Sequence, residues 1–201
     1  MKKIFLSSTN KDLVDERKKA LDILDQMPDV KAVAMERFLA DPNQSKEVCL
    51  RNLRDCDAVV LILGTKYGSL DPDEVLSITE IEYNEAKRLG IPIFVFLKTN
   101  ADGIWVPEED DTPDESGESL KSRLLRFKNR LDTELERDKF QNVNELGEKI
   151  LLAIYNYERD HGELGVKISV FQSAESYFRP YLEEKKLFNH CHPFFGREEI
   201  L

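Results

Sequence analysis

Residues 58–64 read AVVLILG, six consecutive apolar side chains closed by a glycine. An uninterrupted apolar run of this length favours a strand that is buried on both faces, as in the middle of a parallel sheet. Two further apolar runs, at 3–8 and 93–97, predict strands before and after it. The intervening segments 10–27 and 77–89 have the apolar spacing of amphipathic helices. Strands that alternate with helices are joined by right-handed crossovers, so we expect a mostly parallel sheet.

The other elements complete a doubly wound α/β fold. We expect a strand at 30–38, a short helix at 45–56, helices at 120–136 and 143–159, and an extended segment at 139–142. Gly90 is expected to end the helix at 77–89 as its C′ residue, and Pro92 prevents that helix from continuing. The strand order expected for such a sheet is 2-1-3-4-5, as in flavodoxin-like folds.

The alternation of strands and helices stops near residue 160, which predicts two parts. The first is an α/β domain at 1–160, and the second is a helical linker at 161–201 with one more helix at 174–186. Within the first part, the stretch 108–118 (EEDDTPDESGE) is acidic and interrupted by Pro and Gly. A segment of this composition has too little apolar surface to pack, so we expect a mobile loop.

Composition limits the partners and the compartment. The 29 Lys and Arg against 39 Asp and Glu give a net charge of −10, which argues against a nucleic-acid partner and against an anionic membrane surface. The apolar run at 4–6 is too short for a signal peptide, and no run of about 18 apolar residues follows. Cys49, Cys56 and Cys191 lack the spacing of a metal site and are odd in number, so we expect reduced thiols in the cytoplasm and no bound metal. The sequence His190-Cys191-His192 is interpreted as solvated linker.

In open parallel sheets, ligands bind beyond the carboxyl ends of the strands where the strand order reverses. For the order 2-1-3-4-5 this crevice lies between the first and third strands, next to the loops 7–12 and 64–80. We expect Ser7, Ser8, Thr9, Tyr67 and Ser77 to contact a nucleotide there. The three hydroxyls at 7–9 equally suit a helix cap, and Tyr67 equally suits loop packing. Asp12, Glu16 and Arg17 are interpreted as a surface ion-pair cluster, and the absence of GxxxxGK[ST] and GxGxxG argues against bound ATP.

The helix at 77–89 contains an acidic residue on its apolar side. At about 100° per residue from Ile78, Glu82 falls near 40°, whereas the apolar face centres near 20°. A desolvated carboxylate without partners costs several kcal/mol, so Glu82 is either a crevice carboxylate or is satisfied by a buried donor. Glu85 falls near 340° and shares this position. Glu80 falls near 200°, on the predicted solvent side, and is explained by a capping box with Ser77.

Several ordered motifs carry a resemblance to a known family. They are KIFLSSTNKDLVDERKKAL, AMERFLA, CDAVVLILGTKYGS, SITEIEYNEAKRLGIPIFVFL and KFQNVNELGEKI, which span about residues 2–155. Together they resemble domain of unknown function 4062, a family similar to TIR domains and nucleoside deoxyribosyltransferases. Members typically precede STAND or NACHT ATPase modules, including antiviral ones. The final residues 194–201, FFGREEIL, are similar to the entry of such a module, so the linker is expected to lead into a truncated ATPase domain.

The resemblance also implies an activity. In the relatives, a glutamate in an E-x-x-x-A context cleaves an N-glycosidic bond, and 82–86 (EYNEA) matches that context. Glu82 is therefore the expected catalytic carboxylate of an NAD(P)-cleaving hydrolase, with NAD as substrate and no other cofactor. Activation is expected through self-association of the attached ATPase in innate immunity. The alternative is a non-catalytic TIR-like module for signalling or self-association.

Overall fold

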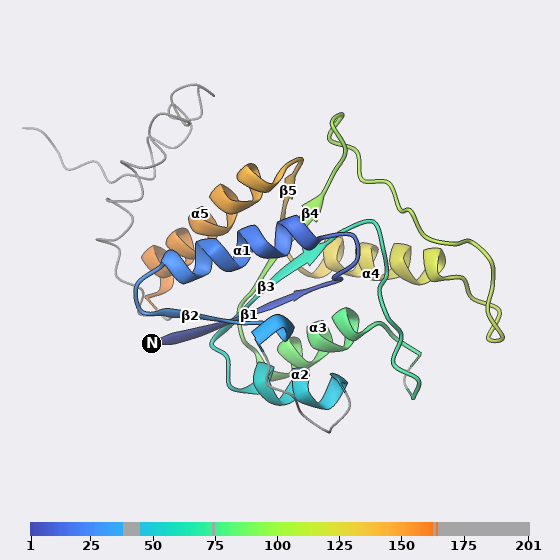
Figure 1. Cartoon of the computed structure of the whole chain (residues 1–201), viewed down its shortest axis with the longest axis horizontal. Helices are drawn as coiled ribbons and strands as arrows, with labels where there is room; N and C mark the ends of the chain where they lie inside the picture. The colour runs from blue at the N-terminus through green and yellow to red at the C-terminus, as the bar shows by residue number, and fades with distance from the viewer. Residues whose placement is uncertain (38–44, 74, 163, 165–201) are drawn as a thin grey trace, which may run out of the picture.

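The computed structural model describes residues 1–37, 45–73, 75–162 and 164, and these form a sheet with helices on both faces (Figure 1). The elements in chain order are β1 (Lys2–Ser8), α1 (Val14–Gln26), β2 (Val30–Val33), the 3-10 helix η1 (Met35–Arg37), α2 (Ser45–Arg54), β3 (Ala58–Leu63), α3 (Ile78–Leu89), β4 (Ile93–Lys98), α4 (Leu120–Glu134), β5 (Arg137–Phe140) and α5 (Val143–His161). The strand order is β2-β1-β3-β4-β5, and every pair is parallel. The predicted α/β fold and strand order are confirmed.

The central strand is β3, as its apolar run predicts. It pairs with β1 on one side and β4 on the other, and all six of its residues are buried. Side chains alternate between the two faces of a strand, so Val60 and Ile62 lie in the apolar cluster with α1 and α5. Val59 and Leu61 lie in the cluster with α2, α3 and α4. Helices therefore cover both faces, which is why this strand needs no polar side.

The ends of α3 follow from its sequence. The Ser77 hydroxyl accepts a hydrogen bond from the Glu80 backbone N–H at 3.1 Å, which makes Ser77 the N-cap. Gly90 has a φ of 70° and ends the helix in the left-handed region, where glycine is favoured. The predicted cap and stop are confirmed, and they fix the position of α3 beside the carboxyl end of the sheet.

Two predicted elements are shorter in the structure by more than the one or two residues by which element ends commonly vary. The strand expected at 30–38 ends at Val33, because the Arg37 N–H bonds to the Ala34 carbonyl and turns the chain into η1. The helix expected at 10–27 begins only at Val14. Its missing first turn is a loop in which the Asp12 carboxylate accepts backbone N–H groups from another part of the chain. The extended segment expected at 139–142 is displaced, and it forms the edge strand β5.

The C-terminal predictions lie mostly beyond the described residues. α5 ends at His161, and Gly162 follows with a φ of 65°. The helix expected at 174–186, the sequence at 190–192 and the motif at 194–201 fall outside the described residues, and the division near residue 160 stays a prediction. Across the part of the chain that the structure describes, no helix combines the length and apolarity needed to cross a membrane.

Candidate functional site

The Glu82 carboxylate lies in a buried polar pair at the carboxyl end of β1. Ser7, near the end of that strand, is opposite Leu61 in the β1–β3 register and has no exposed surface. Its hydroxyl donates a hydrogen bond to Oε2 of Glu82 at 2.6 Å. Glu82 itself is only 4% exposed. The predicted position of Glu82 on the buried face of its helix is confirmed, whereas its catalytic role stays a prediction.

Neutral donors surround this carboxylate. Besides the Ser7 hydroxyl, the thiol of Cys49 on α2 donates a hydrogen bond to it. Burial disfavours the charged form and raises the pKa of Glu82 to about 7, while Ser7, Cys49 and, more remotely, Arg17 oppose that rise. The pKa of Cys49 is also raised well above its ordinary value, by burial and by the neighbouring Glu82 charge. A carboxyl group that titrates near neutrality can gain or lose its proton at physiological pH, as acid–base groups in active sites do.

Arg17 is buried, so the predicted surface ion-pair cluster with Asp12 and Glu16 is wrong. The Arg17 guanidinium is 4% exposed and forms a two-pronged ion pair with Glu36, with Nη2 2.7 Å from Oε2. It also donates to the carbonyl oxygen of Ser8 at 3.0 Å and to its hydroxyl at 2.6 Å. Sequence spacing within one helix could not indicate Glu36, because that residue belongs to η1, which follows β2 in the chain.

The other two members of the predicted cluster have different partners. Glu16 is buried and pairs with Lys98 at the end of β4, at 2.8 Å. Asp12 accepts the backbone N–H groups of Thr65 and Lys66 at 2.8 and 3.1 Å. These residues therefore join the end of β1 to the ends of β3 and β4, and they do not pair with one another on the surface.

The crevice between β1 and β3 is closely packed. The Thr9 hydroxyl donates to the Asp12 carboxylate, and Asp12 lies so near β3 that a Cβ at Gly64 would be 2.2 Å from its Oδ2. Gly68 has a φ of 95°, and a Cβ there would be 2.8 Å from Cγ2 of Thr9. Glycine is required at both positions, because the first loop would otherwise collide with the second. The three hydroxyl residues at 7–9 are thus brought together, each with a partner inside the protein.

Glu80 is buried, so its prediction as a solvent-facing residue is wrong. It is 2% exposed, and its carboxylate accepts from the Tyr67 hydroxyl at 2.6 Å and from Arg130 of α4 at 2.7 Å. Only half of the predicted capping box forms, because the Glu80 side chain points to these two partners. The helical wheel failed here because α4 covers the side of α3 that the wheel assigned to solvent.

Tyr67 and Ser77 lie near Glu80 and not near Glu82. Tyr67 is 1% exposed and belongs to the apolar cluster on the α3 face of the sheet. Burial and the Glu80 charge raise the pKa of its hydroxyl to about 12. Ser77 is fully buried as the α3 N-cap. The five residues predicted to contact a nucleotide therefore divide into three consecutive residues at 7–9, of which Ser7 contacts Glu82, and a pair beside Glu80.

Glu85, the third acidic residue on α3, is held by arginines. Arg88 donates to it at 2.7 and 2.9 Å, and Arg54 of α2 donates at 2.6 Å. The Arg88 hydrogen bonds, followed by those of Arg54, lower the pKa of Glu85 to about 2 against the opposing effect of burial. Its position on the apolar side is thus explained by ion pairing at the rim between α2 and α3.

Residues 105–109, which lead into the acidic stretch and include its first two residues, cross the end of β3, and we call this segment the strap. The Trp105 indole N–H donates to the Gly64 carbonyl at 2.8 Å, and the Glu108 N–H donates to the Thr65 carbonyl at 2.9 Å. The Tyr67 N–H donates to the Glu109 carboxylate. The stretch 108–118 is mostly exposed, as its composition indicates, but its first residues are attached to the loop after β3.

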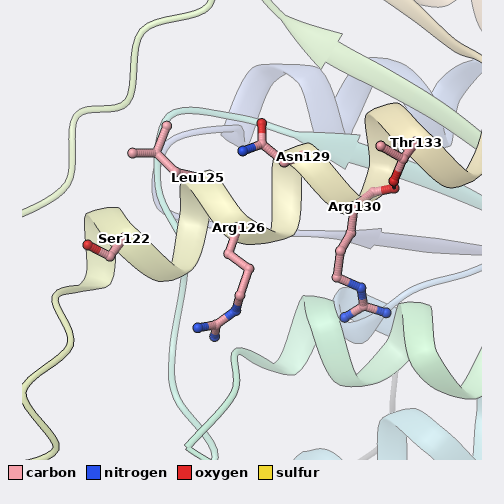
Figure 2. A pocket seen from close by; sticks show the side chains of 6 residues that line it. All are labelled: Ser122, Leu125, Arg126, Asn129, Arg130 and Thr133. Atoms are coloured by element: carbon pink, nitrogen blue, oxygen red, sulfur yellow. Dashed lines mark hydrogen bonds between the residues drawn. The ribbon is translucent and has the colours of Figure 1, made fainter.

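A shallow hollow of about 550 Å³ lies along α4 and not beside Glu82. Its lining residues are Ser122, Leu125, Arg126, Asn129, Arg130 and Thr133. Figure 2 shows that Arg126 and Arg130 point towards α3, whereas Leu125 and Asn129 point the other way. Both arginines have carboxylate partners, Glu118 and Glu80. The side chains do not converge, so this hollow is not a ligand site. Among the described residues, no group of three His, Cys, Asp or Glu could hold a metal ion.

Three residues near these carboxylates could not be predicted from local patterns: Cys49, Arg17 and Arg130. Each comes from a different helix, and the partners are far apart in the chain: Arg17 is 19 positions from Glu36, and Arg130 is 50 positions from Glu80. Amphipathic spacing places Cys49 on the inner side of α2, but the choice of partner depends on the tertiary structure.

Comparison with known proteins gives a family and no function. None of the curated proteins matches the chain significantly. Residues 3–155 match the family described as "Domain of unknown function (DUF4062)", which covers every strand of the sheet and most of α5. The match covers more than half of the chain, and the chain belongs to the domain of unknown function 4062 family.

Proposed function

We propose that this domain cleaves the N-glycosidic bond between nicotinamide and ribose in NAD or NADP, with Glu82 as the catalytic carboxylate. The observation that carries the proposal is the state of Glu82. It is a buried carboxylate at the carboxyl end of the central strands, held by neutral donors, with its pKa raised to about 7. Buried carboxylates without a cationic hydrogen-bond partner are unfavourable for stability, and they concentrate at functional sites.

The chemistry suits a site with one carboxylate. The Glu82 carboxylate attacks C1′ of the ribose, or stabilises the oxocarbenium-like centre there, as the C–N bond breaks. The bonding electrons go to the pyridinium nitrogen, so nicotinamide leaves as a neutral ring and requires no proton. Water then adds to C1′ and gives ADP-ribose and one proton. Only the charged carboxylate can act in this step, and the positive nicotinamide ring would itself favour that form by lowering the pKa.

The burial of Glu82 supports a domain that must rearrange before a substrate can reach this carboxylate. At 4% exposure the carboxylate is covered, and the loops after β1 and β3 are joined by Asp12. We propose that self-association separates these loops and admits the substrate. The sequence at 194–201, which resembles the start of a STAND ATPase, supports an effector role in which ATPase assembly supplies that self-association in antiviral defence.

The test compares two buried glutamates on one helix. NAD loss is measured by product analysis for wild type, Glu82→Gln and Glu80→Gln, in the full-length or artificially oligomerised protein. Removal of a group that acts in the transition state should lower turnover by about 10³-fold with little change in KM. Glu80→Gln removes a buried charge of the same helix and should keep turnover within about fivefold, a change of about 1 kcal/mol in barrier. Wild-type turnover in Glu82→Gln would disprove the catalytic assignment.

One observation favours a second candidate, a non-catalytic interaction module. The serine and the thiol that contact Glu82 leave it covered, as expected for a polar group that has been retained only for packing. For such a module, the assembled wild-type protein should consume no NAD, and Glu82→Gln should self-associate as the wild type does.

A further inference from the structure

The hydroxyl of Ser7 points at Glu82 and away from any solvent-facing surface. Ser7 is fully buried on β1, and the pairing of β1 with β3 places it opposite Leu61. The hydroxyl is 2.6 Å from Oε2 of Glu82, a short hydrogen bond between two buried groups. A hydroxyl in this position has its donor occupied by the carboxylate. The pattern of hydroxyls at 7–9 suggested nucleotide contact for Ser7, but the geometry gives it a different role.

Three groups from three elements act on the Glu82 charge. Ser7 on β1 and Cys49 on α2 donate hydrogen bonds to it, and Arg17 on α1 acts through its positive charge. Ser7 has the largest effect of the three. Arg17 is already paired with Glu36 and bonded to Ser8, which limits what it offers to Glu82. The serine is therefore the principal support for the charged carboxylate.

We infer that Ser7 is a positioning residue: its hydroxyl fixes one oxygen of the Glu82 carboxylate and stabilises the charged form that the proposed reaction uses. The inference rests on the proposed function for its catalytic meaning, although the effect on the Glu82 charge can be measured without any substrate. Ser7 itself does not contact the nucleotide. It acts through Glu82, so its removal should change when the carboxylate is charged and should leave substrate binding as it is.

The test is the pH dependence of NAD turnover in Ser7→Ala, again in the assembled protein. Loss of this donor removes the largest of the three effects that oppose burial, so the midpoint of the pH–rate profile should rise by about one pH unit. Turnover at pH 7 should fall about fivefold to tenfold and should recover at pH 9, with KM unchanged. Ser7→Cys retains a weaker donor and should shift the midpoint by less; it carries the test if the alanine variant does not fold.

Thr99→Ala is the matched control. The Thr99 hydroxyl is also buried near the end of a central strand, but it donates to the Phe140 carbonyl at 3.1 Å and not to a carboxylate. Its removal should leave the midpoint of the profile where it is in the wild type. A midpoint that moves equally in Thr99→Ala would mean that Ser7 acts only through general stability, and it would overturn the inference.

A second measurement separates this inference from the proposed function. The ¹³C resonance of the Glu82 carboxyl carbon, identified by its loss in Glu82→Gln, reports the protonation of that group directly in the 201-residue chain. In Ser7→Ala its titration midpoint should rise by about one pH unit, whether or not NAD is consumed. An unchanged midpoint would overturn the inference even in an active enzyme. A raised KM in Ser7→Ala with an unchanged titration midpoint of Glu82 would indicate instead that Ser7 contacts the nucleotide.

Discussion

The two sides of α3 hold two buried glutamates in opposite ways. Glu80 is 2% exposed and is paired with a guanidinium, Arg130, and with the Tyr67 hydroxyl. Glu82 is 4% exposed and is bonded to a hydroxyl and a thiol. The two residues are two positions apart in the helix, with Ile81 between them, and their burial is nearly equal. Burial therefore does not distinguish them, but the charge of their partners does.

Under the proposed function, this difference separates a structural carboxylate, Glu80, from a catalytic one, Glu82. A cation beside a buried carboxylate compensates the lost hydration, so the pair joins α3 to α4. Neutral donors compensate it only in part, and the carboxyl group then changes its charge near pH 7. Glu80 thus has the cationic partner that a structural role requires, whereas the negative charge of Glu82 has no cation hydrogen-bonded to it among the described residues. A cationic substrate would supply that positive charge.

The largest expected effect is on the pH dependence of turnover in the assembled wild type. In the proposed reaction the charged form of Glu82 is the active one, and burial raises the pKa of this carboxyl group to about 7. Turnover should therefore fall about tenfold for each pH unit below 7 and should level off above it. Glu80→Gln should show the same midpoint. A profile that is flat between pH 5 and 8, or that rises towards acid, would contradict the role of Glu82 as a charged carboxylate.

The next effect is on stability, and it needs no substrate. The pKa of Glu82 is about 7 in the folded protein and 4.5 as the ordinary value, so the folded state binds the proton more tightly. Its contribution to stability is present at acid pH and is lost as the pH rises from 4.5 to 7, by up to about 3 kcal/mol. Glu82→Gln removes this loss. Urea denaturation should show the variant gaining up to about 3 kcal/mol over wild type between pH 4.5 and 8, and a constant difference would count against the raised pKa.

A smaller effect concerns the paired side of α3. Glu80→Gln leaves the Arg130 guanidinium, about one-third exposed, without its closest carboxylate. The loss of this partly buried ion pair should lower the free energy of unfolding by about 1–3 kcal/mol at pH 7. A double-mutant cycle with Arg130→Gln should give a coupling energy of about 1–2 kcal/mol. Additive effects would show that Glu80 and Arg130 are neighbours without a stabilising interaction.

The smallest effect belongs to Glu85, where both arginines are more than half exposed. The pKa of Glu85 is lowered to about 2, so its contribution is present above pH 4.5 and is lost as the pH falls towards 2. Solvent screens such pairs, and Glu85→Gln should cost about 0.5–1 kcal/mol at pH 7 and less in 1 M salt. A salt-independent cost would indicate that Glu85 acts through packing.

Local patterns predict the sheet well because strands and their alternation are encoded locally. The run at 58–64 specified a buried central strand, and all six residues of β3 are buried. The wheel placed Glu82 on the buried side correctly for a similar reason, since the apolar neighbours that define that face belong to the same helix. These are properties of one segment, and the sequence displays them directly.

Partners from other segments could not be predicted in this way. Glu80 was assigned to solvent because nothing in 77–89 shows that α4 covers it, with Arg130 coming from 50 positions away. Arg17 was assigned to the surface because its partner Glu36 depends on where η1 lies. The position of a glutamate in its helix predicts which face of the helix it lies on. Whether its carboxylate is charged depends on neighbours from other segments, which only the folded structure brings together.

The direction of β1 in the sheet determines how far a tag or fluorophore at the amino end lies from Glu82. This strand starts at Lys2, next to the chain's first residue, and it runs through the middle of the sheet before it reaches Ser7 (Figure 1). At about 3.3 Å per residue, the amino end is roughly 20 Å from the carboxylate site. An affinity tag or fluorophore joined ahead of Met1 is thus held at the opposite end of the strands, leaving the loops after β1 and β3 unobstructed. Trimming a few residues from the same end would instead remove an inner strand.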